Sequence, residues 1–260
     1  KNFYLIQDSY GTWTLIQKIE FDDYLEGVLP YEIGSSSPLE ALKAQAVIAR
    51  TWGIFNSDRF NVDKYHLCIT TQCQVYKPTK IKNKNVQKAI EATSNLILAH
   101  KNKPINAFYH GSNGGVFATA GESWQMEDYP YFKSIIDGSK SLSRILKLPI
   151  VSESDLNNFL DFDKDQFYGS NHSLFRWNKK ISSLKIKENL IKNKLININE
   201  DILDLKVIER GYSGRVIKLE IQTNIDNKTI VLFKDNIRRI LSFIPSNLFT
   251  INKLSDDLWL

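Results

Sequence analysis

The sequence predicts an α+β protein, and three observations support this class. The first 13 residues of the 260-residue chain alternate like a strand, and three further strands are expected within residues 202–233. A long helical pattern covers residues 38–57, and glycine-containing turns separate the strand patterns. We therefore expect mixed strands packed on a long central helix, with an inserted or appended α/β subdomain after about residue 139.

The first segment predicts a strand pair followed by a short helix. Residues 1–20 read as two strands around Tyr10 and Gly11. A helix is expected to start near Phe21 and to end before Pro30, because proline removes a backbone donor and clashes with the preceding turn.

The next segment predicts the long helix, over residues 38–57. Ser37 and Glu40 match a capping box, with Pro38 at the first helical position. At about 1.5 Å per residue this helix would be roughly 30 Å long. Its small apolar face, which can approach a neighbour closely, comprises Leu39, Leu42, Ala46, Ala49 and Gly53.

The middle of the chain predicts a loop and a tight turn. Residues 61–82 lack periodicity and are expected to form a loop. A helix over about residues 85–94 and strands over residues 96–99 and 105–109 follow. Residues 112–115, Ser-Asn-Gly-Gly, predict a turn that requires positive φ angles.

The composition changes near Ser139, beyond which Lys, Ile, Leu and Asn are frequent. We therefore divide the chain into a core of residues 1–138 and an inserted or appended α+β subdomain of residues 139–260. The subdomain is expected to contain helices over residues 152–160 and 181–194, and strands over residues 202–209, 215–223 and 228–233, with a hairpin turn at residues 211–214.

Composition and charge exclude some classes of function. The chain is 42% hydrophobic and 24% charged, with a net charge of +5 at pH 7, as in ordinary globular domains. No apolar run approaches the roughly 20 residues of a membrane span, and no nucleic-acid-binding module is present, so neither a span nor nucleic-acid binding is expected. The densest basic run, residues 176–194, is either a solvated helix face or a surface that attracts an anionic polymer or phospholipid headgroups.

Glu32 is the carboxylate that the expected secondary structure does not explain. It is expected in a short turn rich in glycine and serine, between Tyr31 and Ile33 and outside both helices. A carboxylate partly surrounded by apolar groups can act as a proton donor. Glu40, by contrast, is expected to serve only the helix cap.

Five blocks of the sequence resemble the SpoIID/LytB family of cell-wall proteins in order and approximate spacing. The resemblance covers about the first 140 residues and continues more loosely through residues 175–177, 213–216 and 237–241. The blocks are YLEGVLPYEIGSSSPLEALKAQAVIAR at residues 24–50, CITTQCQVY at 68–76, AFYHGSNGG at 107–115, ESW at 122–124 and PYFKSIID at 130–137.

This resemblance implies a peptidoglycan-active protein that works outside the cytoplasmic membrane, with its leader or anchor absent from this numbered chain. Glu32 aligns with the acid/base of lytic transglycosylases, which cleave glycan strands with one carboxylate. The alternative is a non-catalytic, peptidoglycan-binding enhancer of a cell-wall amidase. The family usually continues into a Gly- and His-rich segment, and this chain stops at Leu260 where that segment would begin.

The same blocks supply candidate substrate-binding residues. A histidine can donate or accept a proton near neutral pH, a glycine turn lets a sugar approach the backbone, and aromatic faces can stack on sugar rings. The competing interpretations are an ordinary hairpin turn and aromatic core residues. The candidates are Gln45, Arg50, Gln74, Tyr76, Tyr109, His110, Ser112, Gly114, Gly115, Glu122 and Trp124. A second carboxylate at Glu122 would suit a hydrolase instead.

The chain has two cysteines, Cys68 and Cys73, and His66 precedes the first. Some members of the family hold a metal in this block with a histidine directly before the second cysteine, a position that is Gln72 here. A zinc site of His66, Cys68 and Cys73 would lack a fourth protein ligand. A disulfide, expected in an oxidising compartment, and free thiols are the alternatives. The proposed chemistry itself requires no cofactor.

Overall fold

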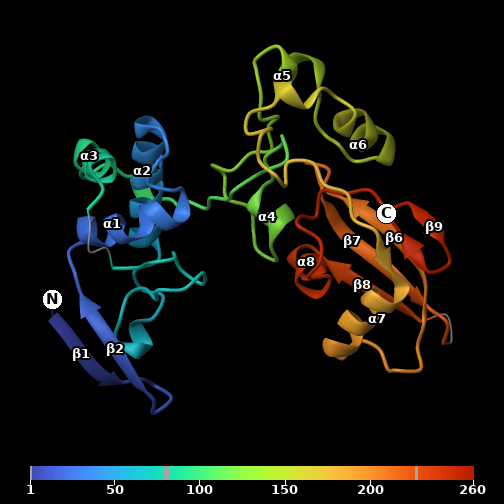
Figure 1. The fold of residues 1–260 in the computed structure, drawn as a ribbon, viewed down its shortest axis with the longest axis horizontal. Coiled ribbons are helices and arrows are strands. Elements are labelled where there is room, and N and C mark those ends of the chain that lie inside the picture. The colour runs from blue at the N-terminus through green and yellow to red at the C-terminus, as the bar shows by residue number, and fades with distance from the viewer. Residues whose placement is uncertain (1, 79–81, 226–227) are drawn as a thin grey trace. The chain divides into compact units, whose positions relative to one another are not determined.

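The computed structural model describes residues 2–78, 82–225 and 228–260, and the chain forms two compact units, residues 1–109 and residues 110–260 (Figure 1). The α+β class is confirmed. The expected packing of the strands on one long central helix is wrong. Within the described residues the strands form several small antiparallel sheets, and the longest helix has 17 residues and packs against other helices.

The first unit begins with the predicted strand pair. Strands β1 (Asn2–Gln7) and β2 (Trp13–Lys18) form an antiparallel hairpin, with Leu5 opposite Leu15 (Figure 1). The Asp8 carboxylate accepts hydrogen bonds from the backbone N–H groups of Tyr10 and Thr12 and so holds the turn.

Three helices form the core of the first unit: α1 (Phe21–Glu32), α2 (Leu39–Phe55) and α3 (Lys84–Ala92). The predicted small face of α2 is confirmed, since Ala46 and Ala49 are fully buried and a Cβ at Gly53 would lie 2.7 Å from the Phe21 ring. The buried apolar residues are Tyr24, Leu25, Val28, Leu29, Leu42, Ala46, Ala49, Val86, Ala89 and Ile90.

Helix α1 does not end before Pro30, so the predicted position of Glu32 outside any helix is wrong. Pro30 lies within the helix, and the Ile33 N–H still donates to the Leu29 carbonyl at 3.0 Å. Proline removes only one helical hydrogen bond here, while the buried face of α1 stays packed against its neighbours. Glu32 is therefore the last residue of α1.

The predicted capping box at the start of α2 is also wrong. Pro38 is the N-cap residue, with an extended ψ of 144°, so Ser37 lies one position too early to cap the helix. The Ser37 hydroxyl donates instead to the Ile33 carbonyl at 2.7 Å. Glu40 is exposed and pairs with Lys43 one turn later, at 2.7 Å.

The loop after α2 contains one short 3₁₀ helix, η1 (Asn61–Asp63), and residues 79–81 of the predicted loop lie outside the described residues. Strands β3 (Ala99–His100) and β4 (Lys103–Pro104) are much shorter than the strands expected in this region. Lys101 and Asn102, both with positive φ, make the turn between them.

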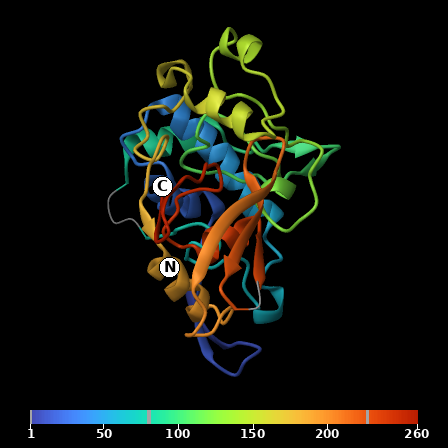
Figure 2. The same cartoon turned by 90° about the vertical axis from the view of Figure 1, so that its right-hand side faces the viewer.

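The second unit is built around an antiparallel sheet of β6 (Ile202–Arg210), β7 (Val216–Thr223) and β8 (Thr229–Phe233), as the sequence predicts (Figures 1 and 2). Residues 226 and 227 lie outside the described part. The flanking helices are α7 (Ser183–Lys192), predicted from the sequence, and α8 (Asp235–Ile240).

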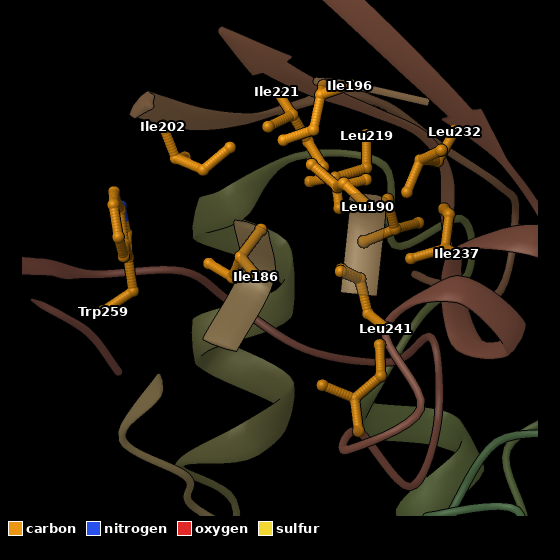
Figure 3. Close-up of a cluster of buried hydrophobic side chains, with 12 residues drawn as sticks. Ile186, Leu190, Ile196, Ile202, Leu219, Ile221, Leu232, Ile237, Leu241 and Trp259 are labelled. Carbon is orange, nitrogen blue, oxygen red and sulfur yellow. The ribbon is translucent and has the colours of Figure 1, made fainter. Parts of the chain in front are cut away.

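Figure 3 shows the core between this sheet and its helices. Ile186 and Leu190 of α7 point towards Leu219 and Ile221 of β7, and all four are at most 2% exposed. The other buried members of this core are Ile196, Ile202, Val216, Leu232, Ile237, Leu241, Ile244 and Trp259.

A second apolar core of the same unit holds its shorter elements. The predicted helix over residues 152–160 is confirmed as α6 (Glu153–Leu160), with a capping box between Ser152 and Asp155. The core residues are Val116, Leu142, Ile150, Leu156, Phe159, Phe167, Phe175 and Leu248. The remaining elements are α4 (Ala120–Ser123), α5 (Leu142–Ile145), η2 (Lys164–Gln166), β5 (Ile181–Ser182), β9 (Lys253–Ser255) and β10 (Leu258–Trp259).

The composition change at Ser139 falls inside the second unit. An antiparallel bridge joins Gly138 to Phe167, so residues before and after the change pack together. Among the described residues, none of the helices combines the length and the apolar character that crossing a bilayer needs.

Helix α7 offers a matched pair of leucines that tests the core. Leu190 is fully buried and Leu184, on the same helix, is 63% exposed. We expect Leu190→Ala to lower the free energy of unfolding by about 2–5 kcal/mol, because it leaves a cavity. Leu184→Ala should change it by at most about 0.5 kcal/mol. Urea unfolding measures both, and equal losses in the two variants would contradict this packing.

Candidate active site

Glu32, the carboxylate predicted as the acid/base, lies where three segments of the first unit come together. It is half-buried at the end of α1, and its Oε1 accepts a hydrogen bond from the backbone N–H of Val75 at 2.9 Å. The Tyr109 hydroxyl also hydrogen-bonds to the Glu32 carboxylate. Segments from three parts of the first unit therefore meet at Glu32.

Gln74 connects this arrangement to the core. Its side chain is 1% exposed, and its Oε1 accepts a hydrogen bond from the Tyr24 hydroxyl at 3.1 Å. Its Nε2 donates to the Tyr109 hydroxyl at 3.2 Å, which leaves the Tyr109 proton for Glu32. Gln74 thus orients one hydrogen-bond donor to Glu32 directly and, through its neighbour Val75, a second one.

Both tyrosines of this network remain protonated over the ordinary pH range. Burial, and then the negative charge of Glu32, raise the pKa of Tyr109 well above its usual value. Burial is also the main cause that raises the pKa of Tyr24. Tyr109 therefore keeps the proton that it donates to the Glu32 carboxylate over the ordinary pH range.

Tyr76 and Gly27 explain how the 74–77 segment lies along α1. A Cβ at Gly27 would be 2.3 Å from the Tyr76 ring, so only glycine allows this approach. The Lys77 N–H donates to the Gly27 carbonyl at 3.1 Å. The Tyr76 ring stacks on Tyr24 with 5.5 Å between centroids, so one of its faces is already covered and not open to a sugar.

Arg50 and Gln45, two other predicted substrate-binding residues of the first unit, lie in buried positions. Arg50 is 4% exposed and its Nη1 donates to the carbonyls of Thr93 and Leu96, at 2.8 and 3.1 Å. These hydrogen bonds satisfy backbone carbonyl groups just beyond the C-terminal end of α3, so the geometry gives Arg50 a structural role. The buried Gln45 Nε2 has no hydrogen-bond partner among the described residues.

The two cysteines lie next to one another, and the structure holds both as free thiols. The Cys73 sulfur accepts a hydrogen bond from the Cys68 N–H at 3.2 Å. Burial, and a hydrogen bond to Cys68, raise the pKa of Cys73 to about 12. Within the described part of the chain, no three His, Cys, Asp or Glu side chains are placed to hold a metal ion, and His66 is exposed. The residues present do not fit a zinc site, and the disulfide stays a prediction.

In the second unit, the residues 112–115 turn has the predicted geometry. Gly114 and Gly115 have φ angles of 67° and 97°. The Phe167 ring packs against Gly115, where a Cβ would lie 2.6 Å from it. The Gly115 N–H donates to the Asn113 side chain at 2.8 Å.

Two arginines hold this turn, and the sequence analysis did not select either. Arg215 donates through Nη2 to the carbonyls of Asn113 and Val116, at 3.0 and 3.1 Å. Arg176 donates through Nη1 to the Gly114 carbonyl at 2.8 Å. Both arginines lie in blocks that resemble the family loosely, residues 175–177 and 213–216. That loose resemblance is the feature of the sequence that could have pointed to them.

Glu122, expected at the rim of a sugar groove, is bound to the β6–β7 turn. It is 9% exposed, and its Oε1 accepts a hydrogen bond from the Ser213 N–H at 3.0 Å. A Cβ at Gly211 would lie 2.6 Å from this oxygen. Its contacts give Glu122 a structural role, whereas nearby Trp124 is 41% exposed.

His110 and Ser112, with Gly114, line a cavity of about 460 Å³ within the second unit. Desolvation by the surrounding protein, and then the positive charge of Arg215, lower the pKa of His110. His110 is therefore mainly neutral near neutral pH and can accept or donate a hydrogen bond.

Comparison with known families follows the division into two units. A family model described as "Stage II sporulation protein" matches residues 9–100. The chain carries a SpoIID family domain. Residues 118–259, more than half of the chain, match a second model, described as "Domain of unknown function (DUF8618)", and the chain belongs to that family.

Curated relatives agree with the SpoIID assignment. The Amidase enhancer of Bacillus subtilis is 40% identical over 107 residues, which are 41% of this chain and 14% of that protein. The Stage II sporulation protein D of Bacillus subtilis is 31% identical over 135 residues, 46% of this chain and 39% of that protein. An uncharacterised protein of Brachyspira hyodysenteriae is 36% identical over 110 residues, 40% of this chain and 28% of that protein. The matches therefore span well under half the length of each relative.

The two buried tyrosines predict how stability depends on alkaline pH. The unfolded chain releases phenol protons at about pH 10, whereas folded Tyr24 and Tyr109 keep theirs to higher pH. The free energy of unfolding should therefore fall as pH rises above about 10. In Tyr109→Phe this fall should be shallower, as urea unfolding at several pH values can show. A control, Tyr10→Phe, alters a side chain that is 85% exposed. If both variants keep the native slope, the placement of Tyr109 is wrong.

Proposed function

We propose that this chain cleaves peptidoglycan glycan strands as a lytic transglycosylase, with Glu32 as its general acid and base. One observation carries the proposal: Glu32 is held by hydrogen bonds from the Val75 N–H and the Tyr109 hydroxyl. Glu32 and Val75 both lie within residues 9–100, which match the SpoIID model. Two donors from different segments hold the carboxylate in one orientation, as acid–base catalysis at a single group requires.

The proposed reaction uses Glu32 twice. Glu32 in its acid form gives its proton to the oxygen of the glycosidic bond, and the bond from that oxygen to C1 of the muramic acid breaks. The resulting carboxylate accepts the proton of the C6 hydroxyl as O6 of the same sugar bonds to C1. The products are a 1,6-anhydro end and a new 4-hydroxyl end, and Glu32 returns to its acid form without consuming water. Ordinary glycoside hydrolysis differs, because it uses a pair of carboxylates.

The surrounding residues have supporting roles in this proposal. Tyr109 donates to the Glu32 carboxylate between the two proton transfers, and its raised pKa keeps it protonated then. Gln74 positions Tyr109 and is itself held by the Tyr24 hydroxyl and the core. Because Gln74 is almost fully buried, it acts as a positioning residue.

We propose that this activity takes place outside the cytoplasmic membrane, on peptidoglycan glycan strands. This step rests on the SpoIID match and on the two named relatives from Bacillus subtilis. The net charge of +5 at pH 7 would favour association with an anionic wall.

A second candidate function is supported by one relative in particular. The match to the Amidase enhancer covers 107 residues at 40% identity. In this alternative the chain binds peptidoglycan and stimulates a cell-wall amidase, and Glu32 contacts the sugar without transferring a proton. The two candidates differ in whether a glycan bond breaks.

Glu32→Gln separates the candidates. We expect native protein to release anhydro-muramic products from purified glycan strands, with and without peptide stems, and Glu32→Gln to lower the rate at least about 100-fold. The amide retains the size and the acceptor oxygen for the Val75 N–H but cannot give a proton. Mass spectrometry of the products gives the measurement.

Glu40→Gln is the matched control, because Glu40 is exposed and its one ion pair among the described residues is with Lys43, three residues away. It should cleave at the native rate. Products with free reducing ends would replace the transglycosylase with a hydrolase. If native protein binds strands and stimulates an amidase but releases no anhydro product, the second candidate replaces the first.

A further inference from the structure

The cavity of the second unit is strongly basic. Its volume is about 460 Å³, within the range of ligand pockets, and its lining comes entirely from residues 110–260. None of the described residues that line it is Asp or Glu. The cationic residues that line it are Arg176, Lys179, Arg215 and Arg238, and two histidines, His110 and His172, line it as well.

Arg176 is the most informative of these residues. Its Nε and Nη2 atoms are buried and have no hydrogen-bond partner among the described residues. Its guanidinium lies over the rings of Phe159, Phe167 and Phe175, at 5.3, 5.4 and 4.4 Å from their centroids, which removes it from water. Burial accordingly lowers the pKa of Arg176. Because water cannot reach its two unpaired nitrogens, Arg176 contributes positive charge to the cavity wall rather than free donors.

Two further groups add donors or positive charge to the same cavity. The Leu174 N–H donates to Nδ1 of His172 at 3.1 Å, so a neutral His172 carries its proton on Nε2 and can donate from there. Arg215 is fixed by the carbonyls of Asn113 and Val116, and it contributes a positive charge.

Lys179 and Arg238 also line the cavity and are themselves exposed. Each has a neighbour in sequence with the same charge, Lys180 and Arg239, that is exposed but does not line the cavity. The effect of a positive charge in the cavity lining can therefore be compared with the effect of the same charge one residue away, outside the cavity.

Aromatic side chains in the cavity indicate the kind of molecule to which the anionic group is attached. Trp177 and Phe249 line the cavity with ring centroids 6.3 Å apart, and the Trp177 Nε1 donates to the Ser246 hydroxyl at 3.3 Å. Ring faces of this kind pack against the C–H groups of sugars and polyols. The volume is far larger than a bare phosphate or carboxylate needs.

We propose that this cavity is a binding site for an oxyanion group, phosphate or carboxylate, attached to a sugar or polyol. Lys179 and Arg238 contact the anion, the positive charge of Arg176 attracts it, and the aromatic walls contact its carrier. This site lies in the part of the chain that matches a domain of unknown function, and it does not depend on the role of Glu32.

Titration calorimetry on the whole chain at low salt tests the proposal with two matched ligand pairs. Glycerol 3-phosphate is compared with glycerol, and N-acetylmuramic acid, which has a free carboxylate, with N-acetylglucosamine, which has none. We expect at least one anion to bind and its neutral partner not to bind. Raising the salt concentration should weaken the binding.

Lys179→Gln and Arg238→Gln should each weaken binding of that anion about three- to tenfold. The controls Lys180→Gln and Arg239→Gln remove the same charges next to the cavity and should change the affinity less than about twofold. Since all four side chains are exposed, the variants are expected to fold, and circular dichroism checks this.

The phosphate arm and the carboxylate arm distinguish the two sources of the anion. Binding of only one acid assigns the site to that group, and binding of both assigns it to oxyanions in general. The proposal is overturned if neither acid binds, if the neutral partners bind equally well, or if the control variants lose as much affinity as Lys179→Gln and Arg238→Gln.

Discussion

The hydrogen bond from the Val75 N–H to the Glu32 carboxylate is the interaction on which the candidate active site depends. It joins the last residue of α1 to a loop that has little regular structure of its own. That loop can approach α1 because Gly27 has no side chain, and the Tyr76 ring occupies the space. A buried glutamine, Gln74, then fixes the position of the loop from its other side. The packing of the first unit thus determines where a half-buried carboxylate points.

In the second unit, arginine side chains rather than a buried glutamine hold the backbone of the loop in place. Two arginines donate hydrogen bonds to the carbonyl oxygens of a glycine turn. In a helix or a sheet, backbone N–H groups would satisfy these oxygens instead. Fixing the backbone with charged groups also leaves positive charge beside the cavity. Arg215, whose pKa burial lowers to about 10, contributes that charge while it is bonded to backbone oxygens. Structural support and electrostatic character therefore come from the same side chains.

The sequence predicted the elements with clear periodicity and missed the contacts between distant segments. The β6–β8 strands, the α7 helix and the positive φ angles at Gly114 and Gly115 follow from local patterns and turn chemistry. Glu32 was selected through its family motif and its position, but it was placed outside a helix because Pro30 was expected to end α1. With α1 ending before Pro30, the sequence could not predict that Tyr24 and Glu32, eight residues apart, belong to the same helix.

Other parts of the site could not be predicted from local sequence. The roles of Gln74 and Tyr109 depend on a side-chain hydrogen bond across 35 residues. Arg50 looked like a binding residue, but its donors go to the carbonyls beyond α3, at a separation of 43 to 46 residues. The basic cavity combines residues from 110 to 260, and no one segment shows its charge.

The most direct test of this account compares the Val75 amide resonance of ¹⁵N-labelled native protein with that of two variants by nuclear magnetic resonance. If Glu32 accepts the hydrogen bond from the Val75 N–H, Glu32→Ala should move the Val75 amide proton to lower chemical shift, because the acceptor is removed. Glu40→Ala, which removes an exposed carboxylate of α2, should leave that resonance in place. A Val75 amide proton that keeps its native chemical shift in Glu32→Ala would contradict the central claim.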